Sequence, residues 1–123
     1  MIKHLNRSGG DEPGFEVGGE VLLLINNCLN EVLHGFRTPA LDDKLEISVE
    51  AAENLLDRVN RTADLENPVV LSASELAAIA KCIHLTVFEL DLEFSIRTGF
   101  QIESANSYAK EISEAITGNR TQP

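Results

Sequence analysis

Residues 71–90 read LSASELAAIAKCIHLTVFEL and carry the strongest local structural signal in the chain. Ser72 and Glu75 have the spacing of a capping box, in which each side chain accepts a hydrogen bond from the backbone N–H of the other residue. Leu71 and Leu76 flank this pair at the positions of a hydrophobic staple. We therefore predict that a helix begins here. Its apolar residues cover so much of its circumference that it belongs at the centre of the fold or in an oligomer interface.

Working outward from this segment, three further stretches place apolar residues at helical spacing. Gly35 can take the left-handed conformation that ends the first helix, and Ser48 is a suitable N-cap for the second. Residues 38–47 and 94–102 lack this periodicity, and we predict ordered loops there. The expected helices besides the one at 72–92 are 20–34, 48–61 and 105–118.

Together these elements predict an all-α fold, a four-helix bundle made of two helix-loop-helix units in one domain. A shift of 55 residues superimposes the two units, with Glu20 on Glu75 and Leu24 on Ile79, so an internal duplication is plausible. Four amphipathic helices would also produce much of that similarity without common ancestry. The predicted boundaries are a flexible N-terminal arm at 1–19, unit one at 20–61, a linker at 62–71, unit two at 72–118 and a disordered tail at 119–123.

The charge of the chain bears on its partners. Twenty acidic residues against ten basic ones give a formal net charge of −10. Such a field repels nucleic acids and anionic membranes, and it favours a basic protein partner. The alternative is that the charge serves only solubility. Polar residues at the start of the chain and two cysteines in apolar helical stretches, Cys28 and Cys82, predict a cytoplasmic protein.

A run of acidic residues is the first candidate site. The far face of the second predicted helix carries three carboxylates, and the loop before it carries three more. Lys44, Arg58 and Arg61 counter them in part, so a solvated helix face is the competing interpretation. The predicted partner-binding residues are Asp42, Asp43, Glu46, Glu50, Glu53 and Asp57.

A Glu-x-x-His pair on the first predicted helix suggests the second candidate. Glu31 and His34 would share one helix face, as in carboxylate-bridged metal sites, and could converge with His84 and Glu89 of the third helix. The second Glu-x-x-His that such a site needs is missing. The competing interpretation is that His34 favours a helix C-terminus and Glu31 is solvated. We therefore predict no cofactor, and we find no pattern that predicts catalysis.

Two apolar groups complete the set of candidates. Leu85, Phe88 and Leu92 lie on faces of the third predicted helix outside its main apolar stripe, and they suggest a homodimer interface. Phe94, Ile96 and Phe100 surround Arg97, and we expect these three to fix a loop to the core. The leading hypothesis from the sequence is a non-enzymatic, acidic interaction protein that binds a basic partner, as immunity or antitoxin-like inhibitors do. The alternatives are a metal- or ligand-binding bundle and a homodimeric structural protein.

Overall fold

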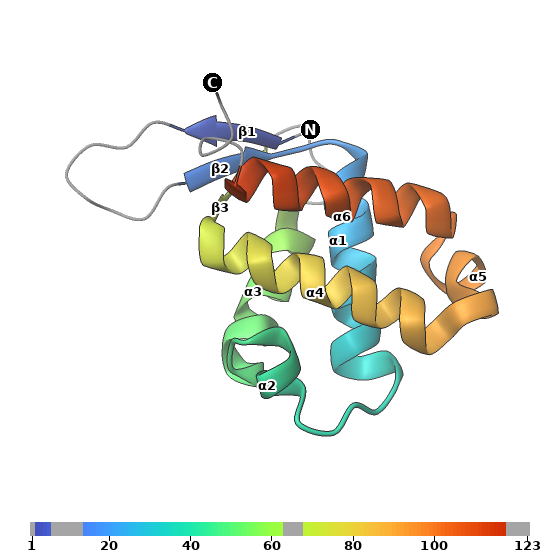
Figure 1. The fold of residues 1–123 in the computed structure, drawn as a ribbon. Coiled ribbons are helices and arrows are strands. Elements are labelled where there is room, and N and C mark those ends of the chain that lie inside the picture. Colours follow the sequence, from blue (N-terminus) through green and yellow to red (C-terminus); the bar gives the residue numbers. More distant parts are fainter. Residues whose placement is uncertain (1, 6–13, 63–67, 118–123) are drawn as a thin grey trace.

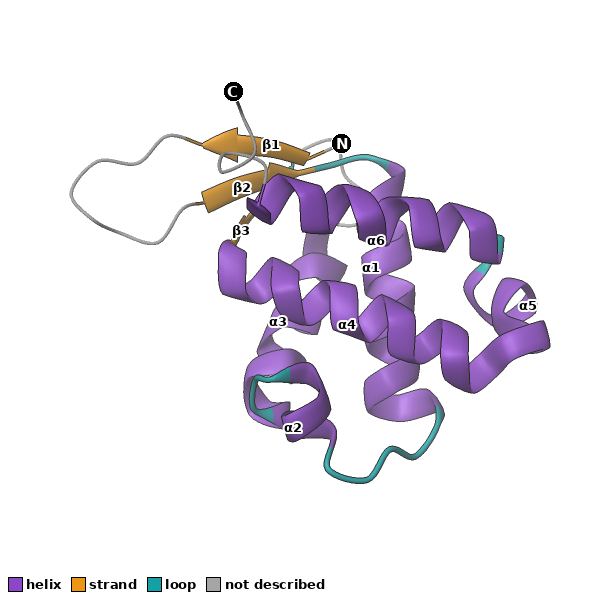
Figure 2. Cartoon of the chain, in the orientation of Figure 1, coloured by secondary structure: helices purple, strands orange, loops and turns teal. Residues whose placement is uncertain are grey.

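The computed structural model describes residues 2–5, 14–62 and 68–117, and it is mainly helical, as predicted (Figure 1). A small sheet accompanies the helices (Figure 2). In chain order the elements are β1 (Ile2–Leu5), β2 (Gly14–Val17), α1 (Glu20–Asn30), the π-helix η1 (Glu31–Gly35), α2 (Leu41–Leu45), α3 (Val49–Thr62), β3 (Val69–Ser72), α4 (Ala73–Leu90), the 3₁₀-helix η2 (Asp91–Glu93), α5 (Phe94–Thr98) and α6 (Ile102–Thr117).

Helix α4 is the central element. It packs most extensively against α6, and it also contacts α1, α2 and α5 (Figure 1). Leu76, Ile79 and Ile83 are completely buried along it. Burial of an aliphatic side chain of this size stabilises the fold by about 1.5–3 kcal/mol. The sequence predicts this helix either at the centre of the fold or in an oligomer interface, and in the structure it lies at the centre.

The predicted helix starts at Ser72 and Ser48 are confirmed. Ser72 Oγ accepts a hydrogen bond from Glu75 N–H at 3.1 Å, while Glu75 Oε1 accepts one from Ser72 N–H at 2.9 Å. Ser48 Oγ accepts from Ala51 N–H at 3.0 Å. These side chains satisfy N–H groups that would otherwise have no partner within the helix.

The sheet is the largest departure from the predicted fold. Its strands are antiparallel in the order β1-β2-β3. On one face, Phe15 pairs with Leu71 and Val17 pairs with Val69, and all four side chains are buried. Val70, between the two buried β3 residues, faces outward. The sheet therefore adds its own apolar layer to the helical core.

Two predicted boundaries are corrected by these strands. The flexible arm at 1–19 is wrong for residues 2–5 and 14–17, and the linker at 62–71 is wrong for residues 69–71. Each strand is only four residues long, and so brief an alternation of buried and exposed residues does not stand out from the surrounding sequence. The predicted tail at 119–123 lies outside the described residues.

The two predicted loops also contain short helices, α2 and α5. Ala40 and Glu46 lie on either side of α2 with positive φ angles of 54° and 63°. Gly99 follows α5 with a φ of 81°, the usual left-handed cap at the end of a helix. Each helix has only five residues, which is too short for an apolar period to show in the sequence.

Candidate functional site

The six carboxylates predicted to face a partner are all exposed, on α2, the turn after it and α3. Ala52, Leu55 and Val59 of α3 are buried, and their spacing turns the acidic positions of that helix toward solvent. We call the six residues the acidic ridge: Asp42, Asp43, Glu46, Glu50, Glu53 and Asp57.

Half of the acidic ridge lies within ion-pair distance of a basic side chain, and one of these partners, His34, is charged only when it is protonated. Asp42, Asp43 and Glu50 form no ion pair within the described part of the chain. Arg58, predicted as a counter-ion, instead contacts Glu75, with 2.7 Å between Nη2 and Oε1. The nitrogen-to-oxygen distances of the paired ridge acids are 3.3 Å for His34–Glu53, 2.7 Å for Arg61–Asp57 and 3.8 Å for Lys81–Glu46.

A different carboxylate, Glu31, lies in the interior. It is 8% exposed, and Nη2 of Arg97 on α5 lies 2.8 Å from its Oε1. The expectation that Glu31 is solvated is therefore wrong. Among the described residues Oε1 accepts no aligned hydrogen bond, so the opposite charge of Arg97 is what compensates its burial.

Gly35 completes this arrangement, which we call the Glu31 junction (Glu31, Gly35 and Arg97). The chain here is a π-helix, and Phe36 N–H donates to the Glu31 carbonyl oxygen at 3.1 Å. A Cβ atom at Gly35 would overlap with Glu31 Oε1 and would lie 3.2 Å from Arg97 Nη2. Only glycine leaves room for the carboxylate beneath it.

The predicted metal-ligand set is not brought together. Within the described residues, no three His, Cys, Asp or Glu side chains converge in a way that could hold a metal ion. Glu31 faces Arg97, His34 lies beside Glu53, and Glu89 is exposed. His84 instead lines an open cavity between α4 and α6.

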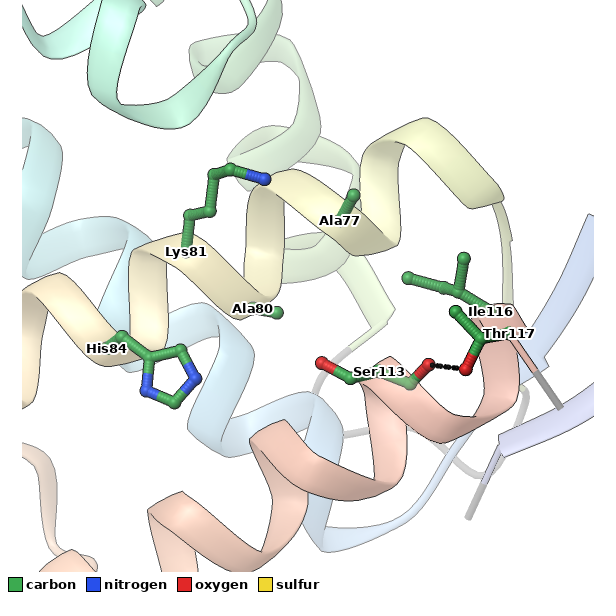
Figure 3. Close-up of a pocket in the computed structure, with 7 residues that line it drawn as sticks. All are labelled: Ala77, Ala80, Lys81, His84, Ser113, Ile116 and Thr117. Atoms are coloured by element: carbon green, nitrogen blue, oxygen red, sulfur yellow. Dashed lines mark hydrogen bonds between the residues drawn. The ribbon is translucent and has the colours of Figure 1, made fainter.

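That cavity has a volume of about 240 Å³, with Ala77 and Ala80 of α4 in its lining. Figure 3 shows Lys81 and His84 extending from α4 in different directions, so the two basic groups do not converge on one point. Thr117 Oγ1 at the far end donates to the Ser113 carbonyl oxygen at 3.0 Å (Figure 3). Nothing in this lining defines a ligand.

Both cysteines are buried free thiols. Burial raises the pKa of Cys28 to about 12, and burial followed by the nearby Cys28 raises the pKa of Cys82 well above its usual value. Thr86 Oγ1 lies 3.5 Å from the Cys28 carbonyl oxygen, and it donates a hydrogen bond to the Cys82 carbonyl oxygen at 2.7 Å. Thiols in such surroundings are poor nucleophiles and serve as small apolar side chains.

The C-terminal end of α4 carries an exposed apolar surface. Phe88, Leu92 and Ile96 are 79%, 86% and 83% exposed. Leu85, predicted with the first two of these, is instead partly buried against the core. Ile96 was expected to fix a loop to the core, and that expectation is wrong, although Phe94 and Phe100 are buried as expected. We call Phe88, Leu92 and Ile96 the apolar corner.

Two residues of these sites are not predicted from the sequence: Arg97 as the partner of Glu31, and Ile96 as part of the apolar corner. Phe88, Leu92 and Ile96 are four residues apart each time, but this spacing does not define one helix face, because α4 ends between Phe88 and Leu92. No local signal joins Glu31 to Arg97 either, because they are 66 positions apart and meet only through the packing of η1 and α5.

Comparison with known proteins gives no relative. No protein-family model, curated protein or solved structure matches the chain. Within the described residues, no helix combines the length and the apolar character that crossing a membrane requires.

Proposed function

We propose that this chain is a non-enzymatic protein-interaction module that binds a basic protein, in the manner of a small acidic inhibitor or regulator. The observation that supports this most directly is the state of Asp42, Asp43 and Glu50. These carboxylates are exposed, close together in the sequence and without an ion pair among the described residues. They can meet a partner without breaking an ion pair among the described residues, although Asp42 Oδ1 accepts a hydrogen bond from Asp43 N–H at 3.0 Å.

The physical role of the acidic ridge is to steer and orient the partner. A chain with a net charge of −10 attracts a basic surface over about one Debye length, roughly 8–10 Å at physiological salt. Complementary charge of this kind raises association rates more than it raises affinity, and it lowers the affinity for acidic competitors. Nucleic acids and anionic membranes would be repelled by the same field.

We also propose a cytoplasmic location and an origin by internal duplication. The two buried free thiols suit a reducing compartment. A shift of 55 residues places β2 on β3 and the last residue of α3, Thr62, on the last residue of α6, Thr117. In each half a strand is followed by a long helix, a five-residue helix and a second long helix. A sequence profile built from homologues should align the two halves at this shift.

The first experiment is a pull-down from the native host at low salt, followed by measurement of association rates with the recovered protein. In the test variant, Asp42→Asn, Asp43→Asn and Glu50→Gln remove three charges from the ridge. We expect the association rate to fall about tenfold and its dependence on salt to weaken.

A matched variant removes the same charge elsewhere, through Glu16→Gln, Glu111→Gln and Glu114→Gln on β2 and α6. We expect it to slow association by less than about threefold, because only the net charge changes and not the local surface. Equal effects of the two variants, or no effect of either, would reject the acidic ridge as the binding surface. Thermal unfolding of all three proteins verifies that each is folded.

A further inference from the structure

We propose that the apolar corner and an acidic cavity beside it form a second docking site, which takes a protein segment with a Lys or Arg side chain next to apolar residues. The site lies at the C-terminal end of α4, whereas Glu46 of the acidic ridge lies 3.8 Å from Lys81 in the middle of that helix. The two surfaces are therefore separate, and either proposal can fail while the other holds.

The exposure of the corner is the first observation. Large apolar side chains that are about four-fifths exposed are common singly, but here three come from the consecutive elements α4, η2 and α5. Their separate exposed areas add up to on the order of 400 Å² of apolar surface, similar in size to the functional patches of monomeric proteins. A partner that covers Phe88, Leu92 and Ile96 would remove this surface from water.

The cavity beside Leu92 is the second observation. It has a volume of about 210 Å³ and lies between η2 and the first turn of α6. Leu92 and Ile102 supply apolar lining, and Asp91 and Glu103 supply carboxylates, neither of which forms an ion pair within the described residues. A long basic side chain fits this chemistry, because its aliphatic stem covers apolar surface while its charged head reaches the carboxylates.

The charge around the corner identifies the partner further. Glu89, Asp91 and Glu93 are exposed acids interleaved with the apolar residues. A second copy of this chain, joined about a two-fold axis, would bring two such acidic sets together, which is unfavourable. The bare apolar area is also only about half of what one subunit of a stable dimer buries, roughly 800 Å². A basic segment of another protein satisfies both the apolar and the acidic parts.

The backbone holds this site in place before a partner arrives. Asp91 ends α4 with a φ of 48° and a ψ of −115°, a conformation that favours glycine. Phe94, two residues beyond Leu92, is completely buried, and Thr98 Oγ1 donates to its carbonyl oxygen at 2.7 Å. The exposed Leu92 and Ile96 are thus carried on an anchored turn, which lowers the entropy lost on binding.

The test selects peptides from a random display library for binding to the full chain. Peptides that also bind a single variant carrying Phe88→Ser, Leu92→Ser and Ile96→Ser are removed. These side chains are exposed, so the variant should keep the fold, which circular dichroism and thermal unfolding verify. We expect a consensus with a Lys or Arg next to two or more apolar residues. A neutral or acidic consensus, or no enrichment over the variant, would overturn the proposal.

Two further variants locate the basic side chain of a selected peptide. Asp91→Asn with Glu103→Gln keeps the apolar corner but removes the charge of the cavity, and we expect affinity to fall about tenfold or more. The ridge variant Asp42→Asn, Asp43→Asn and Glu50→Gln should bind within about twofold of the wild type. A loss of binding only in the ridge variant would reject this site and leave the proposed function standing.

Sedimentation equilibrium of the full chain tests whether a second copy of the chain covers the apolar corner. We expect a monomer at all concentrations. A dimer that dissociates in the Phe88→Ser, Leu92→Ser and Ile96→Ser variant would show that a second copy covers the corner, and it would overturn the proposal.

Discussion

The Glu31 junction and the acidic ridge both hold a carboxylate close to an arginine, but in opposite surroundings. Glu31 lies 2.8 Å from Arg97, and its side chain is 11% exposed. Asp57 of the ridge lies 2.7 Å from Arg61, and its side chain is 59% exposed. The two distances are almost equal, so the pairs differ in burial and in origin, since Asp57 and Arg61 are neighbours on one helix and Glu31 and Arg97 meet through tertiary packing.

This difference determines what each carboxylate can contribute. An exposed pair contributes about 0–1 kcal/mol to stability, because water and salt screen it. Removing one partner of a buried pair costs far more, since the remaining charge stays out of water. The charge of the Glu31 junction is therefore committed to the fold, and the charge of the ridge remains available for a partner.

The largest expected effect comes from Arg97→Ala, compared with Arg61→Ala on the ridge. Arg97→Ala leaves Glu31 buried without its counter-charge, and we expect the free energy of unfolding to fall by about 2–3 kcal/mol. The estimate stays below the full range for buried pairs because the Arg97 side chain is itself 39% exposed. Arg61→Ala should cost less than about 0.5 kcal/mol. Urea unfolding at neutral pH measures both.

Removing the charge of Glu31 tests whether that charge causes the loss of stability in Arg97→Ala. Glu31→Gln in the Arg97→Ala background should recover about half of the lost stability, because an uncharged amide is less costly to bury than a carboxylate. If Arg97→Ala and Arg61→Ala lower the free energy of unfolding equally, the Glu31 junction contributes no more to stability than the ridge does.

A smaller effect is expected from Gly35→Ala. The added methyl group overlaps with Glu31 Oε1, so the carboxylate must move away from Arg97, at a cost of about 1–2 kcal/mol. Because the clash is with Glu31 itself, Gly35→Ala should cost much less in a Glu31→Ala background. A double-mutant cycle by urea unfolding checks this coupling, and additive effects would contradict the geometry.

The sequence predicts some of these features and not others for clear physical reasons. Ser72, Glu75 and Ser48 act within one helical turn, so their caps were predictable from local spacing. The exposure of the ridge followed from the apolar period of α3. The pairing of Phe15 with Leu71 depends on the register between two strands that are far apart in the chain. A strand of four residues carries too little pattern to predict that register from its own sequence.

The role of Glu31 was hidden for a related reason. Three residues before His34 it resembles part of a metal site, and next to Asn30 on a predicted helix it resembles a solvated side chain. It contacts Arg97 of α5, a short helix in a segment where the sequence predicts a loop. A carboxylate's environment is a tertiary property, so neighbouring residues in the sequence did not determine it.

The smallest expected effect concerns a member of the ridge itself, Glu46. This residue ends α2 in the left-handed conformation, with a φ of 63°, where glycine is strongly preferred. Glu46→Gly relieves about 1 kcal/mol of backbone strain, and about half of that is offset by the greater freedom of glycine in the unfolded chain. We expect a net gain in stability of about 0.5 kcal/mol, measurable by thermal and urea unfolding.

The control for Glu46→Gly is Glu46→Gln, which removes the charge and keeps the strained backbone. It should leave stability within about 0.2 kcal/mol of the wild type, because the 3.8 Å contact with Lys81 is largely exposed. A gain for glutamine as large as that for glycine would show that charge repulsion, not backbone conformation, is the source. If only glycine stabilises, the chain keeps a side chain at a position where glycine would be more stable, which is expected of a residue retained for a partner.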